Sequence, residues 1–232
     1  MTASVALTGG AMKEIDISTW ERKSHYEWFS GFANPTFSMN VRLDLTAFLA
    51  FCKKQGLSSY AALMYAVCAA LNGEKAFRYR VLGGKVYEIE RANVAYTLSV
   101  RDEYFVNSHS KTDTDLVSFC RGVREKADAL RNSTYVQEEF NDTTVVDEIY
   151  CSCVPWIDFL SVVQPIPDNL PESSCIPRAA WGKYVKKGRR TYTTFNLTAS
   201  HALVDGKDMS GALLRLQRML DNPRKYFMGD KK

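Results

Sequence analysis

The sequence of 232 residues is first informative for what it lacks. No stretch approaches the 18 uninterrupted apolar residues of a membrane-spanning helix, and the opening MTASVALTGGAMK has no basic segment before its short apolar run. The six cysteines show no C-x-x-C spacing. Cys52 and Cys68 lie among apolar residues of predicted helices, which is typical of small core side chains in a reducing compartment. We therefore expect a cytoplasmic protein with no membrane partner.

Linkers, repeats and blocks of one charge are also lacking. Without a Gly/Ser tract or a repeat at a fixed period, residues 1–232 are predicted to form a single domain. The 30 basic and 26 acidic residues give a net charge of +4, an excess too small to suggest a nucleic-acid partner. The one dense basic run, Gly182 to Arg190, surrounds a glycine and predicts a hairpin. It is either a solvated turn or a contact for an anion such as a ligand phosphate.

Hydrophobic periodicity divides the chain into interspersed helices and strands. Thr46 is predicted to cap a helix that Gly56 ends, and Ser58 or Ser59 to cap the next. Further helices are predicted over about residues 115–130 and from Lys207 onward. Strands are predicted over residues 77–89, as a hairpin around a Gly-Gly pair, and over residues 93–100, 149–162, 179–185 and 190–199.

The predicted strands come in hairpin-like runs, not in a regular β-α-β alternation. This order favours a mixed, largely antiparallel sheet with helices packed on one face, which is a two-layer α/β sandwich. Within the strand over residues 190–199, alternation sends Phe195 and Leu197 to one face and Asn196 and Thr198 to the other.

One motif in the chain carries possible chemistry, the H-x-x-x-D-G of residues 201–206. His201 follows a predicted strand, where it is either a general base or a histidine hydrogen-bonded within a turn. Asp205 precedes a predicted helix and suits its N-terminus as a cap. Two ligands are too few for a metal, and neither His25 nor His109 comes with a ligand cluster, so no metal is expected.

Four motifs in order resemble those of the chloramphenicol acetyltransferase family, and the likeness runs over almost the whole chain. They are the opening TWERKSHYEWF of residues 19–29, FSMNVRLDLTAF of residues 37–48, CSCVPWIDF of residues 151–159 and SHALVDG of residues 200–206. The resemblance implies transfer of an acetyl group from acetyl-CoA, as co-substrate, to a hydroxyl of chloramphenicol or a related small molecule. It also implies the CoA-dependent acyltransferase fold and a homotrimer with active sites at subunit interfaces.

The resemblance also assigns roles to residues of the site. His201 would be the general base that lets the hydroxyl attack the thioester directly, without an acyl-enzyme. Ser152 would donate to the oxyanion of the tetrahedral intermediate. Asp205 would pair with Arg22 and hold the loop that presents the histidine.

Matching positions imply the residues around the substrates. The acceptor would contact Trp28, Phe29, Tyr96, Phe105, Phe140, Val162 and Thr198. CoA would contact Ser152, Trp156, Lys183 and Tyr184, which would give the basic hairpin its anion.

The sequence departs from the family pattern at several positions. Ser200 replaces the first of the two usual histidines, which is not the base. Val162 and Gln164 stand where drug-binding members carry phenylalanine and leucine, and Thr198 where glutamine is common. A slot that loses a large ring and gains an amide should bind a nonpolar arylamide less well.

Two alternatives follow from these departures. The chain could be an acyltransferase of the same fold with another hydroxyl or a dihydrolipoyl thiol as acceptor, although it lacks the lipoyl domain and flexible linkers that such proteins carry. It could also be a binding protein that keeps the pocket without turnover.

Overall fold

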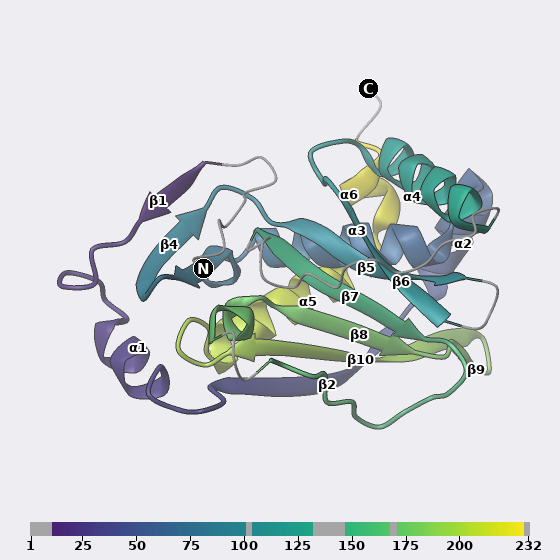
Figure 1. Ribbon diagram of the computed structural model, residues 1–232. Helices are drawn as coiled ribbons and strands as arrows, with labels where there is room; N and C mark the ends of the chain where they lie inside the picture. The colour runs from purple at the N-terminus through teal and green to yellow at the C-terminus, as the bar shows by residue number, and fades with distance from the viewer. Residues whose placement is uncertain (1–10, 101–103, 132–146, 168–170, 230–232) are drawn as a thin grey trace.

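The computed structural model describes residues 11–100, 104–131, 147–167 and 171–229, and its main feature is a seven-stranded sheet (Figure 1). The sheet order is β2 (Thr36–Asp44), β10 (Arg190–Ser200), β8 (Arg178–Gly182), β7 (Glu148–Val154), β5 (Asn93–Val100) and β6 (Tyr104–Ser110), with β9 (Val185–Lys187) paired to β10. The β5–β7 and β7–β8 pairs are parallel and the others are antiparallel. The predicted mixed, largely antiparallel sheet is confirmed.

A second, smaller sheet lies beside the first and contains β1 (Met12–Glu14), β4 (Lys85–Ile89) and β3 (Tyr79–Leu82). Gly83 and Gly84 join β3 to β4 with φ of +55° and +74°. Two consecutive positive φ angles favour glycine and match the twist of a two-residue hairpin turn. The predicted hairpin is therefore present, although its first residues form a short 3₁₀ turn instead of a strand.

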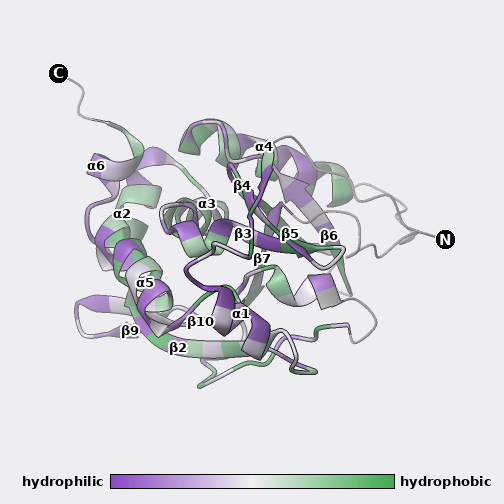
Figure 2. Ribbon diagram, turned by 90° about the vertical axis from the view of Figure 1, so that its left-hand side faces the viewer, coloured by the Kyte–Doolittle hydropathy of each residue, from purple (hydrophilic) through white to green (hydrophobic). Residues whose placement is uncertain are grey.

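Helices cover one face of the large sheet (Figure 1). They are α2 (Thr46–Gln55), α3 (Ser59–Asn72), α4 (Leu116–Arg131), α5 (Gly206–Asp221) and the short α6 (Pro223–Phe227). α1 (Lys23–Phe29) lies apart, at the end of the sheet where β2 begins. In Figure 2, α2 and α5 alternate hydrophilic and hydrophobic residues around their axes, as expected for helices with one buried face.

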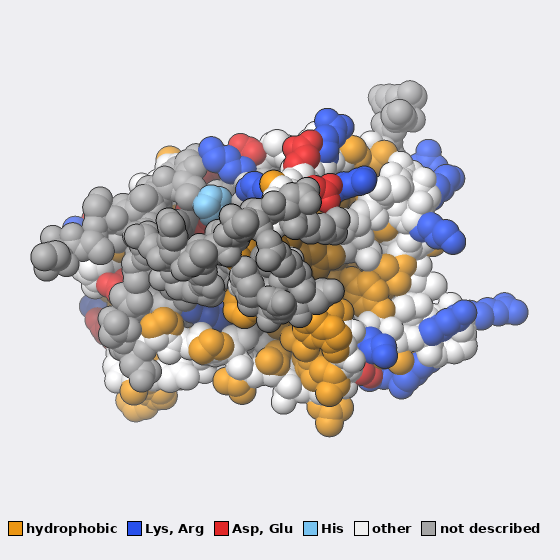
Figure 3. Space-filling model, turned by 45° about the vertical axis from the view of Figure 1, so that its right-hand side comes forward, with side chains coloured by type: hydrophobic (Ala, Val, Ile, Leu, Met, Phe, Trp, Pro, Cys, Tyr) orange, Lys and Arg blue, Asp and Glu red, His pale blue; other side chains and the backbone are white. Residues whose placement is uncertain are grey.

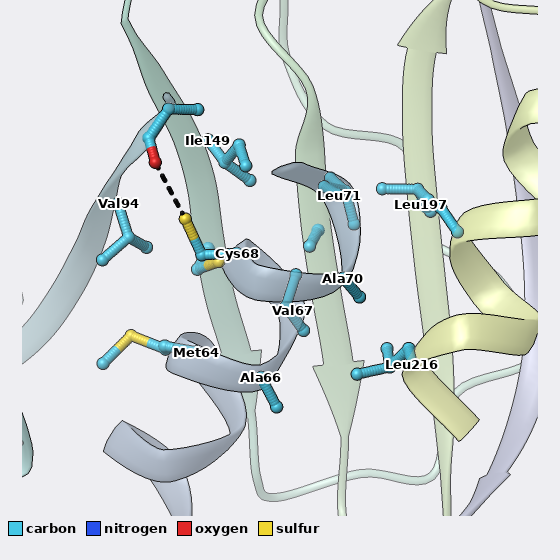
Figure 4. Close-up of a cluster of buried hydrophobic side chains, with 14 of the residues drawn as sticks. Met64, Ala66, Val67, Cys68, Ala70, Leu71, Val94, Ile149, Leu197 and Leu216 are labelled. Carbon is cyan, nitrogen blue, oxygen red and sulfur yellow. Dashed lines mark hydrogen bonds between the residues drawn. The ribbon is translucent and has the colours of Figure 1, made fainter. Parts of the chain in front are cut away.

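The core forms where α3 and α5 pack side by side against the sheet (Figure 4). Val67 and Leu71 of α3 lie close to Leu197 of β10 and Leu216 of α5, and all four are buried. The Cys68 thiol donates to the Ala92 carbonyl at 3.1 Å. The predicted alternation along β10 is present: Phe195 and Leu197 belong to the hydrophobic core, whereas the side chains of Asn196 and Thr198 hydrogen-bond with Asn40 and Ser38 of β2.

Further element boundaries differ from the predictions. The strand predicted over residues 179–185 is divided into β8, which ends at Gly182, and β9, which begins at Val185. The strand predicted over residues 149–162 ends at Val154, directly before Pro155, which cannot donate to a sheet ladder. Thr46 is the first residue of α2 and not its cap. Its hydroxyl donates to Asp44 Oδ1 at 2.5 Å, and the same oxygen accepts the Thr46 N–H at 2.9 Å.

Ser58 caps α3 as predicted, by accepting the Ala61 N–H at 3.4 Å. All six cysteines are free thiols. Within the described ranges, no helix is both long enough and apolar enough to span a bilayer.

Candidate active site

His201 occupies the first position of the turn that follows β10. Its backbone N–H donates to the Pro35 carbonyl at 2.7 Å, which ties the turn to the start of β2. Its imidazole stacks on the Phe29 ring of α1 with a centroid distance of 4.1 Å and an interplanar angle of 4°. The Phe37 ring lies 4.5 Å away at 31°. Two aromatic rings therefore set the direction of the imidazole.

The two ring nitrogens of His201 have different surroundings. Nδ1 is buried and has no hydrogen-bond partner among the described residues. The side chain as a whole is half-buried, and Nε2 is not enclosed in this way. Nε2 is therefore the nitrogen that can meet a substrate proton.

Two carboxylates cap the N-terminus of α5, just after the turn that contains His201. Asp205 is the N-cap of α5, and its Oδ1 accepts the N–H groups of Lys207 at 2.9 Å and Asp208 at 3.2 Å. Asp208 Oδ2 accepts the Asp205 N–H at 3.0 Å in return. This reciprocal pair is a capping box, and it fixes the angle at which the turn enters the helix.

Arg22, the residue directly before α1, contacts both carboxylates of this capping box. Its Nη1 lies 3.1 Å from Asp205 Oδ2 and 3.4 Å from Asp208 Oδ2. The pKa values of the two carboxyl groups shift in opposite directions. Burial opposes the charge of Asp205, but the Asp208 N–H and Arg22 outweigh it and lower its pKa. Burial is the main reason that the pKa of Asp208 is raised.

Ser152 lies where the large sheet opens. β5 and β7 pair from Asn93↔Glu148 to Tyr96↔Cys151, and beyond the last pair the two strands continue without pairing to each other. Ser152 is the first residue of β7 past that point. It lines a cavity of about 1360 Å³ between β5, β7 and α4.

One chain does not bring Ser152 and His201 together. Ser152 pairs with Ala180 of β8, and Ala180 pairs with Asn196 of β10. His201 lies five residues beyond Asn196, which is roughly 17 Å along the strand, and two strand spacings add roughly 10 Å across the sheet. In Figure 1, α1, whose Phe29 contacts His201, lies at one end of the sheet.

Of the other predicted site residues, one contacts His201 and two line the cavity near Ser152. Phe29 contacts His201, whereas Trp28 on the same helix is 68% exposed. Phe105 and Trp156 line the cavity near Ser152 and are 51% and 78% exposed. Val162 is half-buried in the segment that follows β7.

The remaining predicted residues lie away from the cavity lining. Tyr96 is buried in the core, where its hydroxyl pairs with Ser110 Oγ at 2.9 Å. The Thr198 hydroxyl shares a hydrogen bond of 2.7 Å with Ser38 Oγ on the neighbouring strand β2. Lys183 is exposed, while burial raises the pKa of Tyr184. Phe140 lies outside the described residues.

Sequence reasoning missed two parts of the arrangement. Asp208 follows Asp205 by three residues, and this spacing of a capping box was available as a signal. The α4 wall of the cavity was not predicted, because its residues are contributed by a helix face whose neighbours are distant in sequence.

Known proteins resemble this chain in sequence and in fold. The family model described as "Chloramphenicol acetyltransferase" matches residues 11–217. A chloramphenicol acetyltransferase of Staphylococcus intermedius is 27% identical over 83% of this chain and 88% of its own. One of Proteus mirabilis is 26% identical over 89% of this chain and 94% of its own. A solved structure named chloramphenicol acetyltransferase superposes with a TM-score of 0.81 at 22% identity, over 90% of this chain and all of that one.

These matches define first the class and then the family. The class is that of acetyl-CoA-dependent O-acetyltransferases. The chain belongs to the chloramphenicol acetyltransferase family.

Proposed function

We propose that this chain transfers the acetyl group of acetyl-CoA to a hydroxyl of chloramphenicol or a related small molecule. The observation that carries the proposal is the state of His201, whose ring is clamped by Phe29 and Phe37 while Nε2 stays open. A fixed imidazole at a strand end can take a hydroxyl proton, which is the task of a general base.

In the proposed reaction, His201 Nε2 removes the acceptor's hydroxyl proton as the oxygen attacks the thioester carbonyl. The Ser152 hydroxyl donates to the resulting oxyanion. Collapse of the intermediate releases the CoA thiolate, which takes the proton from the imidazolium, and the acetyl ester leaves. Burial raises the pKa of the neighbouring Cys153 thiol to about 12, so this thiol stays protonated at neutral pH and does not compete as a nucleophile.

We further propose that the site is completed by a second copy of the chain, in a homotrimer. A base and an oxyanion donor must both lie about 3 Å from the reacting atoms, and the sheet register keeps Ser152 and His201 of one chain far apart. His201 of one copy therefore acts with Ser152 of its neighbour.

Exposed apolar side chains support contact between copies. The segment after β7 contributes Ile157, Leu160 and Val163, which are 58%, 87% and 90% exposed. Hydrophobic side chains also gather on the face shown in Figure 3. Apolar patches of this kind are typical of protein interfaces.

We also infer that residues 1–232 form one domain, because the buried core joins residues from α1 to α5 in one cluster. We infer as well that the protein works in the cytoplasm, where its free thiols would stay reduced.

The acceptor is proposed to be more polar than the drug bound by the named relatives. The Thr198 hydroxyl is already engaged with Ser38 and Asn196, and it is shorter than the glutamine expected there. Gln164 has a buried side-chain nitrogen with no partner among the described residues. Such a donor favours an acceptor with a carbonyl or hydroxyl oxygen.

Thiol release from acetyl-CoA in the presence of an acceptor panel tests the proposal. The panel contains chloramphenicol and hydroxylated small molecules of different polarity. We expect acceptor-dependent thiol release, and we expect His201→Ala to lower kcat by about 10²- to 10⁴-fold.

His109→Ala is the matched control, because His109 is an exposed histidine on β6, away from His201. It should keep the wild-type rate. Equal rates for His201→Ala and the wild type would contradict the proposal. Binding of an acceptor without any acetylated product on mass spectrometry would favour the non-catalytic alternative.

A further inference from the structure

The cavity beside Ser152 is long and has one helical wall. Its volume of about 1360 Å³ exceeds the roughly 300 to 1,000 Å³ typical of pockets for drug-sized ligands. Val117, Cys120, Arg121, Arg124 and Asp128 of α4 line it at the three- and four-residue spacing of one helix face. From Val117 to Asp128 this face extends roughly 16 Å. The cavity therefore suits an extended ligand.

Charge along this wall is not balanced. Arg124 pairs with Asp128 at 3.7 Å. Arg121, one turn earlier, is exposed and makes no ion pair or side-chain hydrogen bond with any part of the chain that the structure describes. Asp128 is the only acidic residue of the described lining. The α4 wall thus presents one uncompensated guanidinium to the cavity.

The basic hairpin does not supply this charge. Lys183 and Tyr184 are absent from the described lining of the cavity, although both were predicted to contact CoA. Lys183 is held through its backbone N–H, which donates to the Ile157 carbonyl at 2.9 Å. Tyr184 is packed against the core. The only CoA contacts predicted from sequence that line this cavity are Ser152 and Trp156.

We propose that Arg121 binds the phosphate groups of the acyl donor and makes the chain selective for a phosphate-bearing thioester. The inference rests on the proposed function, since acetyl-CoA is its donor. The thioester end reaches Ser152 on the β7 side, and the anionic end lies along α4. A guanidinium forms charge-assisted, bidentate hydrogen bonds with phosphate oxygens. Because Arg121 is exposed, this contact weakens as salt screens it.

Calorimetric titration with CoA and with pantetheine, which has the thiol arm but no phosphate, tests the inference without any turnover. Arg121→Gln should weaken CoA binding about 5- to 20-fold and leave pantetheine binding unchanged. The affinity for CoA should also fall less with added salt in this variant than in the wild type. Arg218→Gln is the matched control, because Arg218 is an exposed arginine on α5 outside the cavity.

Each outcome decides the inference. CoA binding by Arg121→Gln at wild-type strength would overturn it, and so would an equal loss for CoA and pantetheine. A loss confined to Lys183→Gln would place the phosphates at the hairpin and overturn it as well. If the wild type binds CoA through Arg121 but transfers no acetyl group, the proposed function fails and this inference stands. Failure of the wild type to bind CoA would contradict both.

Discussion

At the residue scale, the orientation of His201 comes from aromatic contacts and not from a carboxylate. Within the described residues the imidazole neither accepts nor donates a hydrogen bond, and the Phe29 ring stacks on it with a centroid distance of 4.1 Å. Asp205, four residues along, points instead to the start of α5 and to Arg22. The H-x-x-x-D-G motif therefore combines His201, the proposed general base, with Asp205, which caps a helix.

Asp205 has two separable roles, and two substitutions distinguish them. Asparagine is as good an N-cap as aspartate but carries no charge. Asp205→Asn should therefore keep most of the free energy of unfolding, whereas Asp205→Ala should lose about 1 to 2 kcal/mol. The ion pair with Arg22 adds little to this difference, because the Asp205 side chain is 37% exposed.

Catalysis should respond differently from stability. Both variants lose the ion pair between Arg22 and Asp205 and keep only the longer contact between Arg22 and Asp208. We therefore expect kcat to fall about 10- to 100-fold in each, as for small misplacement of a reacting group. Urea unfolding and initial rates measured on the same preparations check both expectations. Full activity of Asp205→Asn would contradict the positioning role of the charge.

The stability difference should also depend on pH. A carboxyl whose pKa is lowered on folding stabilises the protein above its unfolded pKa and loses this contribution as pH falls through the folded pKa. Asp205 is such a group. The difference in unfolding free energy between the wild type and Asp205→Asn should therefore shrink as pH is lowered below about 4. Asp208 acts in the opposite direction, because its pKa is raised.

At the element scale, the close approach of β8 to the segment after β7 positions Trp156 at the cavity. A Cβ on Gly182 would lie 2.9 Å from the Ile157 carbonyl oxygen and 3.3 Å from the Phe159 ring. The backbone oxygen can give way only if the segment itself shifts. Gly182 is thus required by a neighbour and not by its own φ angle.

Two glycine substitutions have opposite expected results. Gly182→Ala should lower the free energy of unfolding by about 1 to 3 kcal/mol and raise the KM for acetyl-CoA, because Trp156 moves with Ile157. Gly122→Ala, in the middle of α4, has no atom within 4 Å of the new Cβ. It should raise the free energy of unfolding by about 0.5 to 1 kcal/mol. Chemical denaturation and steady-state kinetics check both, and a neutral Gly182→Ala would refute the proposed close contact.

Local sequence signals predicted most elements of the fold. The Gly-Gly hairpin, the Ser58 cap and the helix predicted from Lys207 onward depend on neighbours within a few residues, and all three are present. The end of β7 was missed because the apolar pattern continues past Pro155 into a segment whose side chains are exposed. Periodicity reports apolar spacing, and it does not report whether a partner strand is available.

Local sequence signals predicted the candidate site less completely than they predicted the elements of the fold. His201, Asp205 and Arg22 carried motif signals, and the structure brings the last two within 3.1 Å. Tyr96 was predicted as an acceptor contact by position alone, and its ring faces the core. The register of three strands separates Ser152 from His201, and no local pattern in the sequence encodes that register.

At the scale of the whole molecule, the two halves of the site lie at opposite ends of one sheet. Family membership makes the chain an acetyltransferase, yet the proposed base and the proposed oxyanion donor of a single chain lie too far apart to act on one thioester. The proposed closed ring of three copies would solve this, because each interface would join the His201 end of one sheet to the Ser152 end of the next.

Mixed trimers of two inactive variants test this central claim most directly. His201→Ala and Ser152→Ala chains are co-expressed with different affinity tags, and trimers that carry both tags are isolated. In any such trimer one interface of the three has an intact His201 facing an intact Ser152, so thiol release should recover to roughly one third of the wild-type rate per trimer. Mixed trimers as inactive as the two parents would contradict the account.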